Sequence, residues 1–179
     1  MQQVLKNCKN NLNTLGKMTI RQLMDYKGIG EAKAITILAA CELGKRRQQE
    51  TPEERPDLST ATKIYNHMQP VLQDLNVEEF WVLLLNQHYR LIRKMRISSG
   101  GITETSVDIR IIIKEAVLAN ATILAVCHNH PSGSLAPSKA DEELTKAIQR
   151  ACELMRIHFM DHVILTDGQY LSFHEIGKL

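Results

Sequence analysis

Residues 122–127, Thr-Ile-Leu-Ala-Val-Cys, form a continuous apolar run that constrains the fold more than any other segment. Such a run is typical of a strand that is buried on both faces of a sheet. It lies between two segments with helical patterns, one beginning after Asp108 and ending near Ala119, the other beginning at Ser138 and ending near Arg156. A buried strand between two helices indicates a sheet that is covered by helices.

Further strands and one more helix are predicted around this segment. The strands form two pairs, each joined by a short turn: 79–86 with 90–98, and 157–165 with 169–173. A helix should begin at Ser59 and end near Asp74, interrupted or kinked at Pro70. Gly100 and Gly101 should break the chain after the second strand. These elements together predict an α/β fold with a mixed central sheet flanked by helices.

The first 50 residues differ from the rest of the chain in charge. They contain nine Lys or Arg and four Asp or Glu, whereas residues 51–179 contain thirteen and sixteen. Between the two regions, residues 51–58 have two prolines and no core residue before Leu58, which is typical of an exposed linker. We therefore expect a basic helical region at 1–50, a linker at 51–58 and an α/β domain at 59–179.

The basic region should contain a hairpin of two helices. Thr19 and Gln22 have the spacing of a capping box, and the segment 31–47 follows a helical period. Between them, Lys-Gly-Ile-Gly-Glu-Ala-Lys-Ala resembles the helix-hairpin-helix motif. That resemblance implies contact with a DNA phosphate, because the amides at the start of a helix favour an anion. The residues expected to take part are Lys27, Gly28, Ile29, Gly30 and Lys33; a purely structural or protein-docking hairpin is the alternative.

The chain lacks the apolar segments that address a protein to a membrane. No apolar run approaches the ~18–20 residues that a membrane span needs, and the polar first residues lack the apolar stretch of a signal peptide. We therefore expect a cytoplasmic protein with no membrane partner. Its cysteines should be reduced there, and Cys127, which ends the apolar run, is most simply interpreted as a packing residue.

The segment 128–141, His-Asn-His-Pro-Ser-Gly-Ser-Leu-Ala-Pro-Ser-Lys-Ala-Asp, has the residue types and spacing of a metal site. Residues two apart in an extended backbone point the same way, so His128 and His130 can present two imidazoles to one point. Asp141, in the first turn of the next helix, could add a carboxylate. Two imidazoles, one carboxylate and a vacant position are typical of a catalytic zinc site, although other divalent ions also suit such ligands.

Simpler interpretations of the same residues stay open on spacing alone. Ser138 and Asp141 could form only a helix cap, and the two histidines could be polar residues near a strand end. The letters His-Asn-His also suggest a nuclease of that name. In those nucleases the three residues are scattered along a ββα unit, so the contiguous tripeptide gives little support.

This segment resembles the signature of the JAMM (MPN) metalloprotease family, and more closely the form found in RadC proteins of bacteria. The resemblance extends to residues 27–47, 100–110 and 160–173, and therefore through most of the chain. It implies a JAMM/MPN, cytidine-deaminase-like fold and a zinc-dependent hydrolase of peptide or isopeptide bonds, with the DNA repair role that the family name suggests. RadC proteins have several tens more residues at the N-terminus, so we expect a truncated or short version of the family's chain.

The resemblance also implies roles for individual residues. His128, His130 and Asp141 correspond to the zinc ligands, and Ser138 to the serine that helps stabilise the oxyanion. Glu79 is the best match to the glutamate that serves as general base, with the adjacent Glu78 as the second choice. His162 could orient a ligand through a hydrogen bond, or it could be an ordinary core or surface histidine.

Two other functions are weighed against the hydrolase. The first is a DNA-associated accessory protein without catalysis, in which the hairpin binds DNA and any metal is structural. The second is a deaminase, which would need the cysteine ligands of a Pro-Cys-x-x-Cys arrangement, and the sequence has none. The expected partners are accordingly a protein or peptide substrate and DNA.

Overall fold

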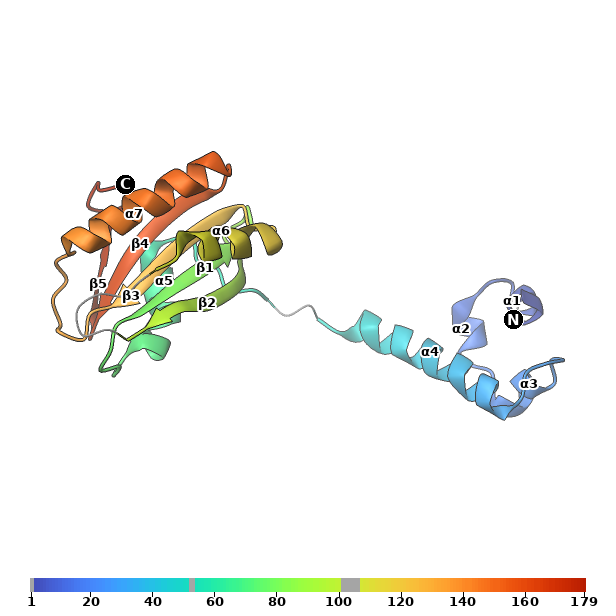
Figure 1. Cartoon of the computed structure of the whole chain (residues 1–179). Coiled ribbons are helices and arrows are strands. Elements are labelled where there is room, and N and C mark those ends of the chain that lie inside the picture. Colours follow the sequence, from blue (N-terminus) through green and yellow to red (C-terminus); the bar gives the residue numbers. More distant parts are fainter. Residues whose placement is uncertain (1, 52–53, 101–106) are drawn as a thin grey trace. The chain divides into compact units, whose positions relative to one another are not determined.

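The computed structural model describes residues 2–51, 54–100 and 107–179 of the chain. They belong to two compact units, Met1–Glu53 and Glu54–Leu179 (Figure 1). Each unit has its own hydrophobic core. Among the helices that are described in either unit, none combines the length and the apolar character needed to cross a membrane.

The first unit is helical, as the sequence predicts. It contains α1 (Gln2–Asn7), α2 (Leu12–Leu15), α3 (Ile20–Met24) and α4 (Glu31–Gln49). Helix α3 begins with the predicted capping box, in which Thr19 Oγ1 accepts from the Gln22 amide and Gln22 Oε1 accepts from the Thr19 amide at 2.8 Å. The sequence patterns did not predict α1 and α2, which contribute Val4 and Leu15 to the core of this unit.

The second unit is built on a five-stranded sheet with the order β2-β1-β3-β4-β5. Its strands are β1 (Glu79–Leu85), β2 (Leu91–Ser99), β3 (Ile123–Asn129), β4 (His158–Thr166) and β5 (Gln169–Ser172). Strands β3 and β4 are parallel, and the other neighbours are antiparallel. The predicted mixed sheet is therefore confirmed, and β3 is buried at every position.

Helices cover both faces of this sheet (Figure 1). On one face, α5 (Ala61–Leu72) packs through Ile64 and Met68 against a core that includes Leu83 and Cys127. On the other face, α6 (Ile109–Leu118) and α7 (Lys139–Leu154) pack against a core that includes Phe80 and Val126. Because successive strand residues alternate between faces, a residue's position in β1 or β3 decides which core it joins.

Several element boundaries differ from those expected. Thr60, not Ser59, caps α5, because its side chain accepts from the Lys63 amide at 3.2 Å. The helix continues through Pro70 to Leu72, so it is not interrupted there. A proline in the last turn removes only one helical hydrogen bond, which explains this tolerance. Gly100 follows the last residue of β2 with a φ of 83°, as expected of a chain break, whereas Gly101 lies outside the described residues.

The boundary that matters most for function is the end of β3. The sequence predicts a strand that stops at Cys127, whereas β3 continues to Asn129. His128 pairs with Phe80 of β1 and with Ile164 of β4, so hydrogen-bonded strands on both sides hold it. His128 is therefore a residue of the sheet and not of the following loop.

Candidate metal centre

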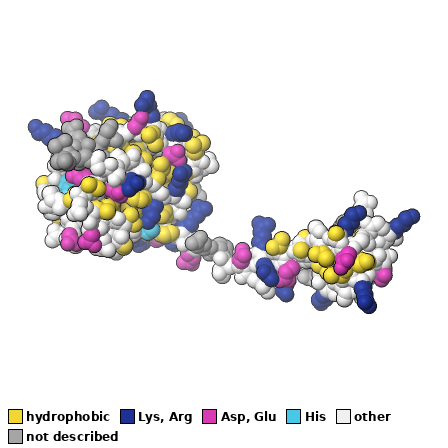
Figure 2. All heavy atoms as spheres, turned by 60° about the horizontal axis from the view of Figure 1, so that its bottom comes forward, with side chains coloured by type: hydrophobic (Ala, Val, Ile, Leu, Met, Phe, Trp, Pro, Cys, Tyr) yellow, Lys and Arg dark blue, Asp and Glu magenta, His cyan; other side chains and the backbone are white. Residues whose placement is uncertain are grey.

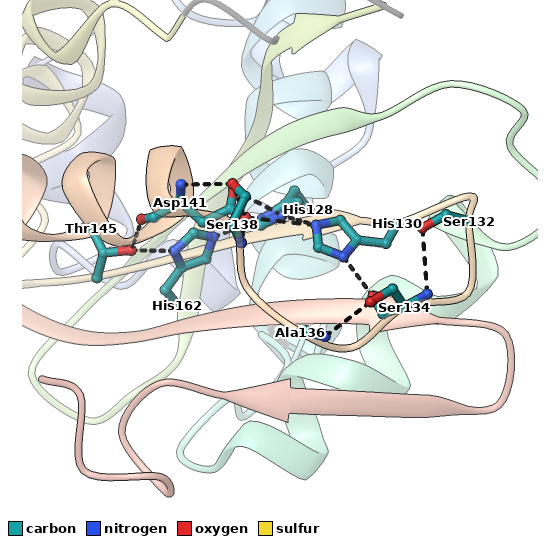
Figure 3. A network of polar contacts seen from close by, with 9 residues as sticks. All are labelled: His128, His130, Ser132, Ser134, Ala136, Ser138, Asp141, Thr145 and His162. Carbon is teal, nitrogen blue, oxygen red and sulfur yellow. Dashed lines mark hydrogen bonds and ion pairs between the residues drawn. The ribbon is translucent and has the colours of Figure 1, made fainter. Parts of the chain in front are cut away.

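Three side chains with metal-ligand atoms meet where β3 ends and α7 begins (Figure 3). The Nε2 atom of His128 lies 2.9 Å from His130 Nε2 and 3.3 Å from Asp141 Oδ1. Asp141 Oδ2 lies 3.8 Å from His130 Nε2. One ligand atom from each residue lies within 4.8 Å of the other two. The structure thus brings together the three residues that the sequence proposes as ligands.

The local sequence explains why these side chains converge. The amide of His130 donates to the Leu165 carbonyl at 2.8 Å, so pairing with β4 continues beyond the end of β3. The imidazoles of His128 and His130 therefore face the same side. Gly133, with a φ of 78°, helps the following loop to turn back. Asp141 then lies in the first turn of α7, where the Ser138 capping box fixes it.

In His130 and Asp141, the polar side-chain atom that points away from the candidate metal position is already hydrogen-bonded to the protein. His130 Nδ1 donates to the Ser134 carbonyl at 2.6 Å. Asp141 Oδ2 accepts from the amide and from the hydroxyl of Ser138, each at 2.7 Å. These bonds leave His130 Nε2 and Asp141 Oδ1 turned toward His128 Nε2. Such support of the outer atoms is how proteins orient metal ligands, so the donor set fits a divalent cation.

Burial and hydrogen bonding give two of the three candidate ligands, His128 and Asp141, the protonation state that a metal needs. Burial lowers the pKa of His128 to about 4, against the opposing effect of the Asp141 charge. Burial alone would raise the pKa of the Asp141 carboxyl, but hydrogen bonds from His130 and Ser138 help to hold it below its ordinary value. A hydrogen bond to Asp141 raises the pKa of His130 despite burial. At neutral pH, therefore, His128 is neutral and Asp141 is ionised, the forms that bind a metal.

The two candidate glutamates occupy different positions relative to the ligands. The carboxylate of Glu79 accepts from Arg96 Nη1 at 2.6 Å, from Trp81 Nε1 at 2.9 Å and from Ser99 Oγ at 3.2 Å. Strand alternation places Glu79 on the face of Trp81, which belongs to the α5 side of the sheet. The hydrogen bonds of the Glu79 carboxylate are thus with β1 and β2 and not with the histidines.

Glu78 is the glutamate that shares a face with His128. It lies two residues before Phe80, which pairs with His128 and whose ring stacks on that imidazole. The Glu78 carbonyl accepts from the Gly100 amide at 3.0 Å, so the extended backbone continues to this position. In addition, the charge of Glu78 contributes to the raised pKa of His130. Strand alternation separates the two glutamates once the pairing of Phe80 with His128 is known.

The ligands face a cavity of about 460 Å³. Its lining combines the ligands His128 and Asp141 with acidic and apolar residues, among them Glu78, Glu79, Phe80, Glu143 and Leu144. A second cavity of about 320 Å³ adjoins His130 and lies between the end of α5 and the β4–β5 turn. The ligand set therefore has open space on both sides in which a substrate could lie.

Ser138 and Cys127 have contacts that bear on their predicted roles. The Ser138 hydroxyl donates to Asp141 Oδ2 and accepts from the Asp141 amide at 3.1 Å. It therefore forms the helix cap and also lies beside the ligands. Cys127 is fully buried in the core on the α5 side, and this burial raises the pKa of its thiol. Its surroundings agree with the packing interpretation.

Sequence reasoning left His162 undecided and missed Thr145. His162 lies in β4, is fully buried, and its Nε2 atom contacts His128 Nδ1 at 2.8 Å. Its Nδ1 atom contacts the Thr145 hydroxyl at 2.6 Å (Figure 3). The available signal was the spacing between Asp141 and Thr145, because residues four apart lie on one face of a helix.

In the first unit, the structure limits which residues of the glycine turn can meet a ligand. Gly28 has a φ of 85°, and Gly30 precedes α4 without a side-chain cap. Ile29, however, is buried in the core of this unit, and its amide donates to the Tyr26 carbonyl at 3.0 Å. The Ile29 side chain therefore packs in the core, and the DNA contact expected of this residue stays a prediction. The ammonium of Lys33 donates to the Gly28 carbonyl at 2.8 Å and so closes the turn.

Comparisons with known proteins identify the family of this chain. Residues 58–178 match the family model described as the RadC-like JAB domain. A UPF0758 protein of Flavobacterium johnsoniae is 44% identical over 176 residues, which cover 98% of this chain and 76% of the relative. A UPF0758 protein of Porphyromonas gingivalis is 39% identical over 180 residues, or 99% and 79% of the two chains. The family model and these relatives therefore show that the chain belongs to the RadC family.

Proposed function

We propose that this protein is a zinc-dependent hydrolase of peptide or isopeptide bonds, with His128, His130 and Asp141 as the metal ligands. The observation that supports the proposal most strongly is the convergence of these side chains, whose outer polar atoms already have protein partners. Zinc bound there would act as a Lewis acid and lower the pKa of a water molecule toward neutrality. The adjoining cavity has room for a substrate.

Glu78 is the residue we assign as general base, in place of Glu79. Its carboxylate would take a proton from the attacking water and return it to the leaving amine. Glu79 cannot easily do so, because its oxygens accept three hydrogen bonds from β1 and β2. We infer instead that Glu79 joins these two strands beside the site. The revision moves the predicted role by one residue, which changes the face of the strand.

Ser138 has a role that its contacts support directly. Its amide and hydroxyl both donate to Asp141 Oδ2, which turns Oδ1 toward His128. We propose that Ser138 orients Asp141. The oxyanion role implied by the family resemblance requires the hydroxyl to turn from Asp141 toward the substrate.

Metal analysis and substrate turnover together test the hydrolase. We expect about one zinc per chain in the purified protein and none in the double variant His128→Ala/His130→Ala. Turnover would be followed by mass spectrometry on a mixture of peptides and lysine isopeptides. Glu78→Gln should retain zinc and lose turnover. The control Ser134→Ala should retain both, because His130 is held by the backbone carbonyl of residue 134, which the substitution leaves in place. A protein that binds no supplied zinc would contradict the proposal.

A second candidate function, DNA binding, is supported by the first unit. The amides at the start of the 19-residue helix α4 have no side-chain cap, and such amides favour an anion. Figure 2 shows Lys and Arg side chains spread around this unit on the visible face, with apolar side chains between them. We expect weak binding that falls steeply with salt. Gly28→Val should weaken DNA binding, because valine strains a backbone with a φ of 85°. DNA binding that is independent of salt would contradict this candidate.

A further inference from the structure

A chain of buried hydrogen bonds leads from α7 through β4 to His128. Thr145 of α7 is 1% exposed, His162 of β4 is 0% exposed, and His128 is 4% exposed. The Thr145 hydroxyl lies 2.6 Å from the Asp141 carbonyl oxygen and 2.6 Å from His162 Nδ1. His162 Nε2 in turn lies 2.8 Å from His128 Nδ1. Water has little access to these groups, so the partners must be satisfied by one another.

The number of protons in this chain determines the direction of each hydrogen bond. The Asp141 carbonyl can only accept, so the single hydroxyl proton of Thr145 is donated there. The Thr145 oxygen must then accept from His162 Nδ1–H. A neutral imidazole carries one N–H, so His162 Nε2 accepts from His128 Nδ1–H. His128 Nε2 is consequently left without a proton, and it is the atom that faces His130 and Asp141.

Aromatic packing holds the central ring of the chain in place. The ring of His162 is stacked on Phe173, with centroids 4.8 Å apart and planes at 13°. The same ring also meets Phe80, with centroids 5.6 Å apart in an edge arrangement. The imidazole therefore cannot easily rotate to offer the opposite nitrogen. This packing keeps Nδ1 toward Thr145 and Nε2 toward His128, so the hydrogen-bond partners of each nitrogen select the tautomer of His162.

We propose that Thr145 and His162 are positioning residues that hold His128 in the tautomer able to bind a metal through Nε2. This inference rests on the proposed metal site. It adds the two residues that select which nitrogen of His128 carries the proton. The relay begins at the carbonyl of Asp141, whose side chain supplies another ligand. It therefore fixes two of the three ligands relative to each other. Loss of such a partner typically weakens metal binding by about 10–100-fold.

The variant Thr145→Val tests the relay, because it keeps the shape of the side chain and removes the hydroxyl. Without that acceptor, His162 can carry its proton on Nε2, and His128 is then driven to carry its own on Nε2. Zinc affinity, measured by competition with a chromophoric chelator, should fall by about 10–100-fold. Thr145→Ser keeps the hydroxyl and should stay within about threefold of the wild type.

A matched control separates the relay from the local helical bond. Thr36 Oγ1 also donates to the carbonyl four residues earlier, Ala32, at 2.8 Å, and it lies in α4 of the other unit. Thr36→Val removes the same kind of bond without a histidine partner, so zinc affinity should not change. Circular dichroism would check that each variant is folded. If folded Thr145→Val binds zinc as tightly as the wild type, or Thr145→Ser binds as weakly as Thr145→Val, the relay is refuted.

A measurement on the metal-free protein keeps this test independent of the hydrolase proposal. Nitrogen-15 NMR of the imidazoles should show His128 and His162 each protonated at Nδ1 in the wild type. A His128 proton at Nε2 would refute the relay even if zinc binds. If wild-type protein binds no zinc but both tautomers are as expected, the metal proposal fails while the relay holds.

Discussion

Glutamine substitutions at positions 78 and 79 should have opposite consequences, although the residues are adjacent. Glu79→Gln should destabilise the protein and leave the chemistry largely unchanged. Glu78→Gln should leave the stability unchanged and abolish turnover. The difference follows from strand alternation, which places Glu78 on the face of His128 and Glu79 on the face of Trp81.

The expected loss of stability follows from the contacts of Glu79. Its side chain is 8% exposed and accepts hydrogen bonds from Arg96, Trp81 and Ser99. Hydrogen bonds to a charged group contribute about 1.5–3 kcal/mol each. Arg96 is 52% exposed, however, so water can replace much of its interaction. Because glutamine keeps one accepting oxygen, we expect a net cost of about 2 kcal/mol.

Thermal unfolding and turnover measure the two effects separately. For a domain of this size, about 2 kcal/mol lowers Tm by roughly 6–10 °C. Glu78 is only half-buried, so Glu78→Gln should change the free energy of unfolding by less than about 0.5 kcal/mol. Removal of a general base typically lowers turnover by about 10²–10⁴-fold. Zinc content should stay at the wild-type level in both variants, since neither glutamate is an assigned ligand.

The reverse pattern would refute this reasoning. If Glu79→Gln loses turnover at an unchanged Tm while Glu78→Gln remains active, the general base has been placed on the wrong face. A wild-type protein without activity on any substrate would leave the Tm difference as the remaining test. Equal Tm values for the two variants would then show that the Glu79 contacts do not join β1 and β2 as proposed.

Three further outcomes are expected. Zinc affinity, measured by chelator competition across a pH series, should fall as pH drops through the pKa of His130, which lies above its ordinary value; affinity that is flat between pH 5 and 8 would argue against this ligand. In metal-free protein, the depressed pKa of Asp141 should stabilise the fold above the unfolded-state pKa of about 3.9, and acid titration should remove this stability as pH falls through the lower folded-state pKa. Leu83→Ala, at a fully buried core position, should cost about 2–5 kcal/mol in chemical denaturation, and a cost below 1 kcal/mol would contradict the assigned packing.

The sequence was most informative where one physical pattern determines one element. The apolar run before His128 correctly predicted a strand buried on both faces, because a run this short between two helical patterns favours a buried strand. The capping-box spacings at Thr19 and Ser138 correctly predicted where α3 and α7 begin. These signals are local, so a single sequence is enough to detect them.

The sequence was less informative where the outcome depends on contacts between distant segments. The strand β3 extends past Cys127 because β1 and β4 pair with it, and no local pattern encodes that pairing. Thr145 was missed because its importance comes from His162, seventeen residues away in β4. Glu78 and Glu79 are chemically identical and adjacent, so only the face on which Phe80 packs distinguishes them.

The Ser138–Asp141 capping box links the start of α7 to the candidate site. The Asp141 carboxylate accepts from the Ser138 amide through Oδ2, and its Oδ1 faces His128. The bond that caps the helix therefore also aims a ligand, and it does so before any metal arrives. His128 and His130 are likewise held by His162 and by the Ser134 carbonyl. Because these bonds belong to the folded chain, metal binding need not supply the energy to organise the site, in contrast to small zinc domains that are unfolded without metal.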